Sequence, residues 1–330
     1  MLSVKVEALD RFDLVGESVW SDLQARCANP VPFLSWPWQN LWWENFADGR
    51  ALKILCVSDS SGEPVGLLPL YEREAGLWRL VGGVDISDYL DVLAVRGSEE
   101  EMWSGLLHHR AGEPDVWDLH CLRAASPTVS ILPALAPAFG LHAVAQREER
   151  CPVLALPESW DGYLGRLSGK DRHELRRKLR RLERHWPDAT VRSHASPEGL
   201  EAAMTAFLAL HRKSKAGKAR FMDLRMERFF QRVAVALAAR GALRLWFLER
   251  DGAAVASYLC LEFDRSVALY NSGFDPAHAA LSPGIVLLSY VIRDAIERGL
   301  ARFDFLRGEE PYKYAFGAVP EDLFNLVVAA

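Results

Sequence analysis

The sequence predicts an α/β protein made of two similar units, each with a mixed, mostly antiparallel sheet flanked by helices. Three observations predict this class. An order of hairpin, helix and strand occurs twice, a strand–helix–strand run implies one parallel strand pair, and the composition is that of a packed globular protein. With 330 residues, 50% of them hydrophobic and 25% charged, the chain is long enough to bury two cores.

The repeat begins with two predicted hairpins. Residues 53–72 and 244–263 each hold two apolar runs around a short polar turn. A helical pattern and then a strand follow each hairpin, at 99–111 and 115–122 in the first copy and at 284–299 and 301–306 in the second. The offset between the copies is nearly constant, 191 positions at the hairpins and 186 at the final strands. We therefore expect two copies of one α/β unit.

The second copy is the clearer one. Its expected elements are a strand near 190–195, helices at about 197–214 and 224–240, a hairpin at 243–263, a strand at 265–273, a helix at 283–298, a strand at 301–306 and a closing strand near 322–328. Because a helix connects them, strands 265–273 and 301–306 are expected to pair in parallel. We place the domain boundary near 150–155, giving units at 1–152 and 153–330.

Charge and cysteine content disfavour several classes of protein. The net charge of −5 argues against a chain that is basic throughout, so a polyanionic partner would need a local patch. The five cysteines are widely spaced and form no C-x-x-C pair, which disfavours a disulfide framework and a metal site. Residues 1–15 carry acidic side chains where a signal peptide needs an apolar run, and no run is long enough for a membrane span. We expect a cytoplasmic protein without metal or membrane contact.

Common catalytic motifs are absent from the sequence. It contains no G-x-x-x-x-G-K, no G-x-G-x-x-G, no G-x-S-x-G and no H-E-x-x-H. Their absence argues against the common nucleotide hydrolases, dinucleotide oxidoreductases, serine hydrolases and zinc proteases.

The helix predicted at 283–298 has an unusual start directly after a strand. Ser282 occupies the N-cap position, Pro283 the first helical position, and Gly284 leaves the backbone uncovered. Free N–H groups and the helix dipole at such a start bind phosphate well. The alternative is that these residues only cap a helix.

The stretch 303–318, FDFLRGEEPYKYAFGA, gathers many titratable groups behind a short strand. At the carboxyl edge of a sheet, where open α/β sheets bind ligands, Arg307 or Lys313 could hold a phosphate or a carboxylate. The candidates for a general base are Asp304, Glu309 and Glu310, and those for a general acid are Tyr312 and Tyr314. The alternative is a solvated loop anchored by two aromatic rings.

The helix predicted at 170–186 is strongly basic on its outer face. Residues 170–185 hold eight Lys and Arg against three Asp and Glu, a net charge of +5 that leaves −10 on the rest of the chain. Such segregated charge suits a phosphate-bearing substrate or an RNA, and it equally suits a solvated face steadied by ion pairs. A second basic stretch, 210–221, is expected to be a loop, either mobile over the substrate or simply solvated.

Residues 273–317 resemble the C-terminal part of GNAT acyltransferases, and more narrowly the FemAB-like acetyltransferases often found in polysaccharide and cellulose biosynthesis loci. The segments that carry the resemblance are DPA at 275–277, SPG at 282–284 and FDFLRGEEPYK at 303–313. The basic segment 167–184 and the aromatic segment 33–46 are similar to helices of the same group. The resemblance implies two tandem GNAT-like domains.

In GNAT proteins the two central parallel strands separate, and the pantetheine arm of acyl-CoA lies between them with its pyrophosphate on the following helix. The resemblance assigns these roles to strands 265–273 and 301–306 and to helix 283–298. It assigns pyrophosphate contacts to Ser282, Pro283, Gly284 and Ile285. The sequence ALSPG replaces the usual Arg/Gln-x-x-Gly-x-Gly/Ala loop of the superfamily, which leaves the donor open between acyl-CoA and the aminoacyl-tRNA that FemABX relatives use.

These observations predict an N-acyltransferase in which an amine attacks a thioester carbonyl directly, with a backbone N–H of strand 265–273 polarising the carbonyl. No Cys or Ser lies in a nucleophile motif, which disfavours an acyl-enzyme. The expected donor is acyl-CoA, most simply acetyl-CoA, and the expected acceptor is a small or sugar-linked amine. A tRNA or other RNA bound by 170–185 is the alternative partner. The predicted catalytic residues are Asp304, Glu309, Glu310, Tyr312 and Lys313, and the predicted substrate contacts are Arg177, Arg181, His211, Tyr270 and Arg307.

The first unit is expected to be a degenerate copy. Its counterpart of the 303–318 stretch, residues 116–134, has neither the paired carboxylates nor the Tyr-Lys-Tyr run. Asp85, Asp88 and Asp91 could line a cleft between the domains or simply lie on the surface.

Overall fold

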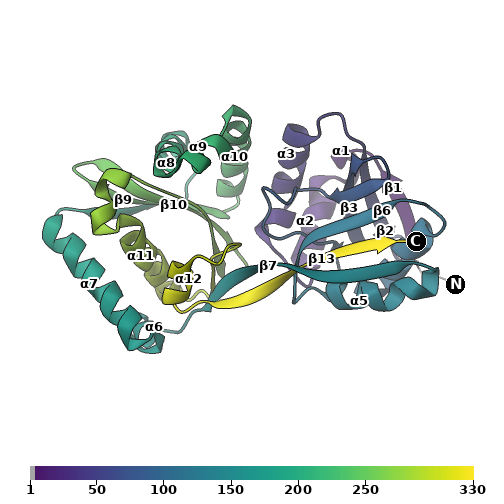
Figure 1. Ribbon diagram of the computed structural model, residues 1–330. Helices are drawn as coiled ribbons and strands as arrows, with labels where there is room; N and C mark the ends of the chain where they lie inside the picture. Colours follow the sequence, from purple (N-terminus) through teal and green to yellow (C-terminus); the bar gives the residue numbers. More distant parts are fainter. Residues whose placement is uncertain (1–3) are drawn as a thin grey trace. The chain divides into compact units, whose positions relative to one another are not determined.

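The structure, a computed structural model, describes residues 4–330 and divides them into two compact units. The first unit takes the chain up to Arg150 together with Glu321–Ala330, and the second takes Cys151–Pro320 (Figure 1). The division after Arg150 lies inside the range 150–155 suggested by the sequence. The chain from Glu321 on, which the sequence assigned to the unit at 153–330, packs in the first unit instead.

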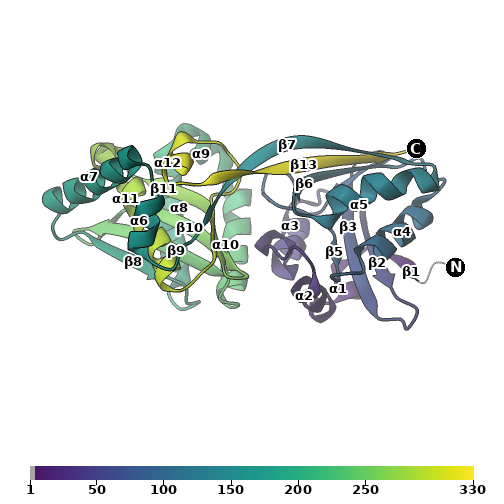
Figure 2. The ribbon, with the colours of Figure 1, turned by 90° about the horizontal axis from the view of Figure 1, so that it is seen from below.

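The first unit contains a sheet with the strand order β1-β2-β3-β4-β6-β13, and β5 pairs with β3. The strands are β1 (Lys5–Leu9), β2 (Leu52–Ser58), β3 (Pro64–Glu74), β4 (Leu77–Leu80), β5 (Leu93–Ala94), β6 (Val116–Arg123) and most of β13 (Val319–Ala329). The helices are α1 (Phe12–Val15), α2 (Glu17–Arg26), α3 (Trp36–Phe46), α4 (Glu99–Arg110) and α5 (Pro127–Leu135), with 3-10 turns at Pro32–Leu34 and Ala136–Phe139. Helices α4 and α5 pack side by side in this unit (Figure 2).

The second unit contains a sheet with the strand order β8-β9-β10-β11-β12-β7. The strands are β8 (Thr190–His194), β9 (Leu243–Arg250), β10 (Ala253–Phe263), β11 (Ser266–Phe274), β12 (Arg302–Asp304) and the end of β7 (His142–Ala155). The helices are α6 (Trp160–Arg166), α7 (Gly169–His185), α8 (Leu200–Ser214), α9 (Ala216–Phe221), α10 (Leu224–Ala238), α11 (Pro283–Glu297) and α12 (Pro311–Ala315), with a 3-10 turn at Pro276–Leu281. Helices α8 and α10 cover one face of this sheet, and α11, with α7 against it, covers the other (Figure 1).

The two sheets repeat one arrangement of strands. Strands β4 and β6 pair in parallel in the first unit, as β11 and β12 do in the second. The hairpins β2–β3 and β9–β10 that precede them are antiparallel. The strand beyond the parallel pair is antiparallel in both units, β13 beside β6 and β7 beside β12. This arrangement confirms the predicted fold of mixed, mostly antiparallel sheets with one parallel crossover each.

The β9–β10 hairpin shows how local sequence sets the register. Asp251 and Gly252 both have left-handed backbone, with φ of 49° and 74°. Two such residues in succession form the tight turn that matches the twist of paired strands, and Asp and Gly tolerate it. The turn brings Arg250 opposite Ala253, and this pairing starts the ladder that positions β10 beside β11.

Helix α11 is the central helix of the second unit. Leu287, Leu288, Ile292 and Ala295 recur with helical spacing and are fully buried. Replacing a buried isoleucine such as Ile292 by alanine typically costs about 2–5 kcal/mol of stability. Their packing fixes the start of the helix beside β11.

Within residues 4–330 no helix is both long enough and apolar enough to cross a membrane. The same residues contain no group of three or more His, Cys, Asp or Glu side chains placed to hold a metal ion. All five cysteines are free thiols, and burial raises the pKa of the Cys27 thiol to about 11.

Candidate functional site

Strands β11 and β12 separate after a short parallel pairing. They pair only where Ser266–Ala268 face Arg302–Asp304, although β11 continues to Phe274. On its other side β11 stays paired with β10, but the register shifts and leaves Tyr270 between the pairs that Leu269 and Asn271 make. Such a bulge re-aims the backbone of a strand. Beyond Ala268 one edge of β11 therefore opens into a gap in the sheet.

Helices α8 and α9 supply the side chains that meet this open edge. Lys218 of α9 donates hydrogen bonds to the carbonyl oxygen and, at 2.9 Å, to the Oγ of Ser272. Ser214 of α8 accepts a hydrogen bond from the N–H of Phe274 at 2.9 Å. Burial, reinforced by the charge of Lys215, lowers the pKa of Lys218 to about 8. A half-buried ammonium group is thus held at the gap.

The prediction that 210–221 is a loop is wrong. Helix α8 continues to Ser214, the backbone is extended at Lys215, and α9 follows at Ala216–Phe221. The helical form is favoured because Lys218 and Ser214 find partners on β11, which a solvated loop would not provide.

His211 lies at the closest approach of α8 to β11. A Cβ atom at Gly273 would lie 2.5 Å from the backbone nitrogen of His211, so only glycine allows this packing. The His211 side chain is 1% exposed, and its Nδ1 lies 3.2 Å from the carbonyl oxygen of Ser272. Because a carbonyl only accepts, Nδ1 carries the proton, and Nε2 keeps a lone pair that has no hydrogen-bond partner among residues 4–330. Burial and the nearby Lys218 lower the pKa of His211 to about 4.

The start of α11 is open, although not in the way the sequence suggested. Ser282 stands at the N-cap with φ of 52°, but its side chain makes no capping hydrogen bond. The expected side-chain cap is therefore absent, because the Ser282 hydroxyl accepts no hydrogen bond from the first N–H groups of the helix. At Gly284 a Cβ atom would meet only the Tyr258 hydroxyl, 3.5 Å away, and that hydroxyl donates to the Gly284 carbonyl at 3.0 Å.

Lys313 and Asp304 hold the loop after β12 in place. The Lys313 side chain is buried, and its Nζ donates to the carbonyl oxygens of Arg307 at 2.7 Å and Gly308 at 2.9 Å. The Asp304 carboxylate accepts from the N–H of Leu306 at 2.8 Å. Leu306 and Gly308 have φ of 56° and 102°, so these bonds support a strained backbone.

The other acidic and phenolic groups of this stretch differ in their surroundings. Glu309 accepts a hydrogen bond from the Tyr314 hydroxyl at 2.9 Å. Glu310 lies 3.0 Å from the Nζ of Lys313; burial opposes its ionisation, but the bond to Lys313 outweighs this and lowers its pKa. Burial raises the pKa of Tyr312 above its ordinary range, so its hydroxyl stays protonated. Glu310 is exposed and Tyr312 partly buried, so both are reachable.

A small cavity of about 280 Å³ adjoins the start of α11. Ile285 of α11, Tyr312 of α12 and Leu175 and Lys178 of α7 all line it. One residue from each of two predicted motifs, Ile285 and Tyr312, thus meets at this cavity, whereas Ser282, Pro283 and Gly284 do not line it. Arg177 and Arg181 line neither this cavity nor the larger one described next, and Arg177 is paired with Glu174 at 2.8 Å.

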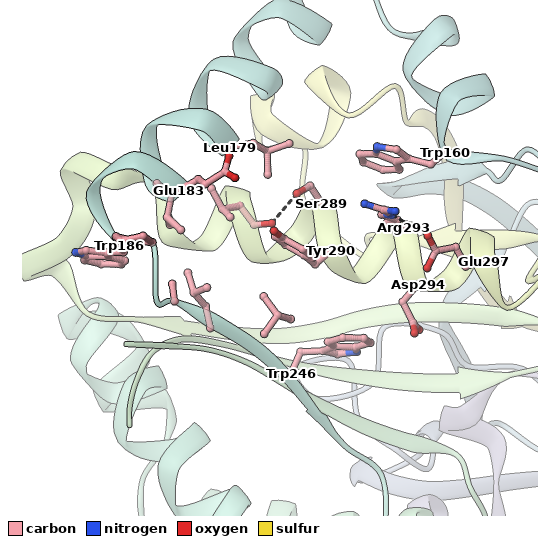
Figure 3. Close-up of a pocket in the computed structure, with 16 residues that line it drawn as sticks. Trp160, Leu179, Glu183, Trp186, Trp246, Ser289, Tyr290, Arg293, Asp294 and Glu297 are labelled. Atoms are coloured by element: carbon pink, nitrogen blue, oxygen red, sulfur yellow. Dashed lines mark hydrogen bonds and ion pairs between the residues drawn. The ribbon is translucent and has the colours of Figure 1, made fainter. Parts of the chain in front are cut away.

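The larger cavity has a volume of about 690 Å³ and lies between α7, α11 and strands β8 and β9 (Figure 3). None of the site residues predicted from the sequence lines it. Its aromatic residues come from segments far apart in the chain, Trp160, Trp186, Trp246 and Tyr290, and no sequence motif joins them. Lys218, Ser272 and Tyr258 were also not predicted as site residues, because their contacts depend on tertiary packing.

The first unit fills the equivalent opening with its own chain. Beyond the pairing of β4 with β6, Leu90 donates its N–H to the Cys121 carbonyl at 3.1 Å, and Ser87 donates to the Gly82 carbonyl at 2.8 Å. Asp91 is buried and accepts from Thr128 at 2.8 Å, and burial raises its pKa to about 6. The interpretation of Asp91 as a surface carboxylate is therefore wrong.

Comparisons with known proteins agree with this geometry. The sequence of residues 169–314 matches the family described as an acetyltransferase (GNAT) domain. A comparison with curated proteins gave no significant match.

Three solved structures share the fold across most of the chain. FemX has a TM-score of 0.64 at 12% identity, covering 97% of this chain and 96% of that one. A conserved protein of unknown function from Bacteroides thetaiotaomicron VPI-5482 has a TM-score of 0.63 at 10% identity, covering 99% and 100%. The C-terminal domain of a putative lysylphosphatidylglycerol synthetase from Agrobacterium fabrum has a TM-score of 0.55 at 12% identity, covering 81% of each chain. At these identities the likeness concerns the fold.

Proposed function

We propose, on the premise that this chain is an acyltransferase of the GNAT superfamily with a FemAB-like fold, that it transfers an acyl group from acyl-CoA to an amine. The simplest donor is acetyl-CoA, and the acceptor is a small or sugar-linked molecule. The observation that carries this proposal is the separation of β11 and β12 beside the open start of α11.

The start of α11 suits the pyrophosphate of the donor. Ser282, Pro283, Gly284 and Ile285 would contact it with their backbone, and the Ser282 side chain makes no capping hydrogen bond that would compete. The positive end of the helix dipole and free N–H groups attract phosphate. The neighbouring 280 Å³ cavity, which Ile285 lines, supports a bound donor at this point.

The gap beside β11 suits the thioester. The acceptor amine would attack the thioester carbonyl carbon, forming the C–N bond as the C–S bond breaks and the sulfur leaves with its electron pair. The backbone of β11 beyond its pairing with β12 and the Lys218 ammonium would stabilise the negative charge that develops on the carbonyl oxygen. Tyr312, protonated because of its burial, would give its proton to the leaving thiolate.

Glu310 is our choice for the base that accepts the amine proton. Asp304 is bound to Leu306 and Arg302, and Glu309 to Tyr314. Glu310 is paired with Lys313 at its carboxylate and remains exposed at the same loop. His211, Tyr270 and Arg307 are proposed as contacts for the acceptor.

A second candidate function is aminoacyl transfer from tRNA. The basic outer face of α7, which includes Arg177 and Arg181, and the likeness of the fold to FemX favour it. We prefer a phosphorylated acceptor for this face, because the rest of the chain carries a net negative charge that would repel a long polyanion.

We propose that the first unit is an inactive copy. The hydrogen bond from Leu90 to Cys121 and the packing of residues 82–91 occupy the opening that a donor would need. The second unit, by contrast, keeps Lys218 and Glu310 at its opening.

The direct test is a turnover assay on the full chain. Acetyl-CoA and longer acyl-CoAs are mixed with a panel of amines that includes amino sugars and sugar nucleotides, and free CoA thiol is measured. We expect amine-dependent release of CoA with at least one pair. Salt-sensitive binding of tRNA with no retention of any acyl-CoA would favour the second candidate instead.

A further inference from the structure

We propose that the second unit carries a saccharide-binding site in the 690 Å³ cavity between α7, α11 and strands β8 and β9. Its volume falls in the range of small-molecule sites, about 300–1,000 Å³. None of the residues assigned above to acyl transfer lines it, so the site goes beyond the proposed reaction.

Aromatic rings form the apolar part of the cavity. Figure 3 shows Trp160 and Trp246 on opposite sides, with Tyr290 and Arg293 between them. Trp186 and Trp246 are each 6% exposed, so packing fixes their rings, whereas Tyr290 is 42% exposed at the rim. Trp160 and Tyr290 keep exposed area and can stack on the C–H face of a pyranose, while the fixed rings of Trp186 and Trp246 form apolar walls beside them.

Polar groups between the rings provide both donors and acceptors. Arg293 is held 2.7 Å from Glu297, and Asp294 is held 3.2 Å from Arg298. Glu183 lies at the exposed rim, and the described part of the chain gives it no ion-pair partner. Sugar hydroxyls both donate and accept, so they need a lining with carboxylates and a guanidinium together.

The charges of the lining disfavour two other classes of ligand. Three carboxylates, Glu183, Asp294 and Glu297, face one guanidinium, Arg293, and this net charge of −2 would repel a phosphate. A cation would suit aromatic rings. However, the Arg293 guanidinium lies among them, and the Arg250 guanidinium already stands 5.1 Å over the Trp186 ring. A neutral polyhydroxylated ligand satisfies the rings and the paired charges together.

The test is isothermal titration of the full chain, without acyl donor, with three neutral oligosaccharides: maltotetraose, cellotetraose and tetra-N-acetylchitotetraose. We expect at least one to bind at micromolar to millimolar concentration. Tyr290→Ala and Glu183→Gln, both at exposed positions, should each weaken that binding about tenfold. Glu201→Gln, at an exposed position of α8 outside the cavity, is the matched control for Glu183→Gln and should leave it unchanged.

Three results would overturn this proposal: failure of all three sugars to bind, binding that Tyr290→Ala leaves intact, and tighter binding of spermidine or inorganic pyrophosphate than of any sugar at the same cavity. Thermal melting confirms that each variant is folded. Since no acyl donor is present, the outcome is independent of whether the acyl-transfer proposal holds.

Discussion

Lys313 binds back to Arg307, with 2.7 Å between the Lys313 Nζ and the Arg307 carbonyl oxygen. The same ammonium also reaches the Gly308 carbonyl at 2.9 Å and is 3% exposed. A buried cation that satisfies successive carbonyls holds its loop in one conformation. We infer that Lys313 positions the site rather than reacting with substrate.

Lys313→Ala should therefore destabilise the protein. Loss of hydrogen bonds to a charged group typically costs about 1.5–3 kcal/mol, and the carbonyls would be left unpaired. Urea unfolding measures this change. Lys213→Ala, which removes an exposed ion pair with Asp275, is the control and should shift stability by less than about 1 kcal/mol. If Lys313→Ala unfolds like the wild type but loses turnover, Lys313 acts in the chemistry instead.

Tyr312→Phe should lower kcat about 100-fold, the usual effect of losing a positioned proton donor. The ring still packs against Phe305, 6.3 Å away between centroids, so the melting temperature should hold. Tyr314→Phe is the matched control, since Tyr314 is bound to Glu309 and should leave kcat nearly unchanged. Equal losses in both variants would remove Tyr312 from the role of acid.

Reversing Arg177 and Arg181 to Glu should raise the KM of a phosphorylated acceptor and barely alter that of the donor. These two residues belong to the basic face of α7, which we propose binds the acceptor's phosphate. They do not line the cavity proposed for the donor, so the donor KM should hardly change. Steady-state kinetics with each substrate varied in turn separates the two effects. The double change Lys5→Glu and Arg11→Glu controls for net charge. A rise in the donor KM alone would place the donor, not the acceptor, on this helix.

His211 should make the protein acid-sensitive. Its pKa falls from 6.5 in the unfolded chain to about 4 in the fold, so between these values the unfolded chain binds more protons. Stability from this group is complete above pH 6.5 and is lost as the pH falls toward 4, by about 3 kcal/mol in total. Urea unfolding at several pH values in this range gives the free energy of unfolding as a function of pH. This free energy should change less steeply with pH in His211→Gln than in the wild type. The control is His173→Gln, at an exposed position, which should keep the pH dependence of the wild type. If His211→Gln also keeps that pH dependence, His211 is not the source of the acid sensitivity.

Much of the fold could be predicted from the sequence, because it depends on local patterns. The turn at Asp251 and Gly252 and the strand–helix–strand order around α11 give the hairpin and the parallel pair directly. The sequence could not predict that the chain from Glu321 on packs in the first unit, since a strand pattern does not reveal which sheet the strand joins.

The site was harder to predict, because burial of charged groups depends on tertiary partners. The sequence shows Lys313 and Lys218 only as charged residues in polar stretches. Their roles follow from tertiary hydrogen bonds, of Lys313 to the Arg307 carbonyl and of Lys218 to the Ser272 carbonyl. The large cavity is lined by side chains from α6, β9 and α11, among others, so no local sequence pattern could predict it. Ser-Pro-Gly at 282–284 was informative because its effect is local to one helix start.

The most direct test of the acyl-CoA proposal is isothermal titration of CoA into the Gly284 variants. A Cβ atom at this position meets only the Tyr258 hydroxyl at 3.5 Å, so Gly284→Ala should fold and bind CoA much as the wild type does. Gly284→Glu adds a negative charge where the pyrophosphate would lie and should abolish measurable binding while α11 still forms. Unchanged CoA affinity in Gly284→Glu, with its melting temperature intact, would contradict the proposed donor site at the start of α11.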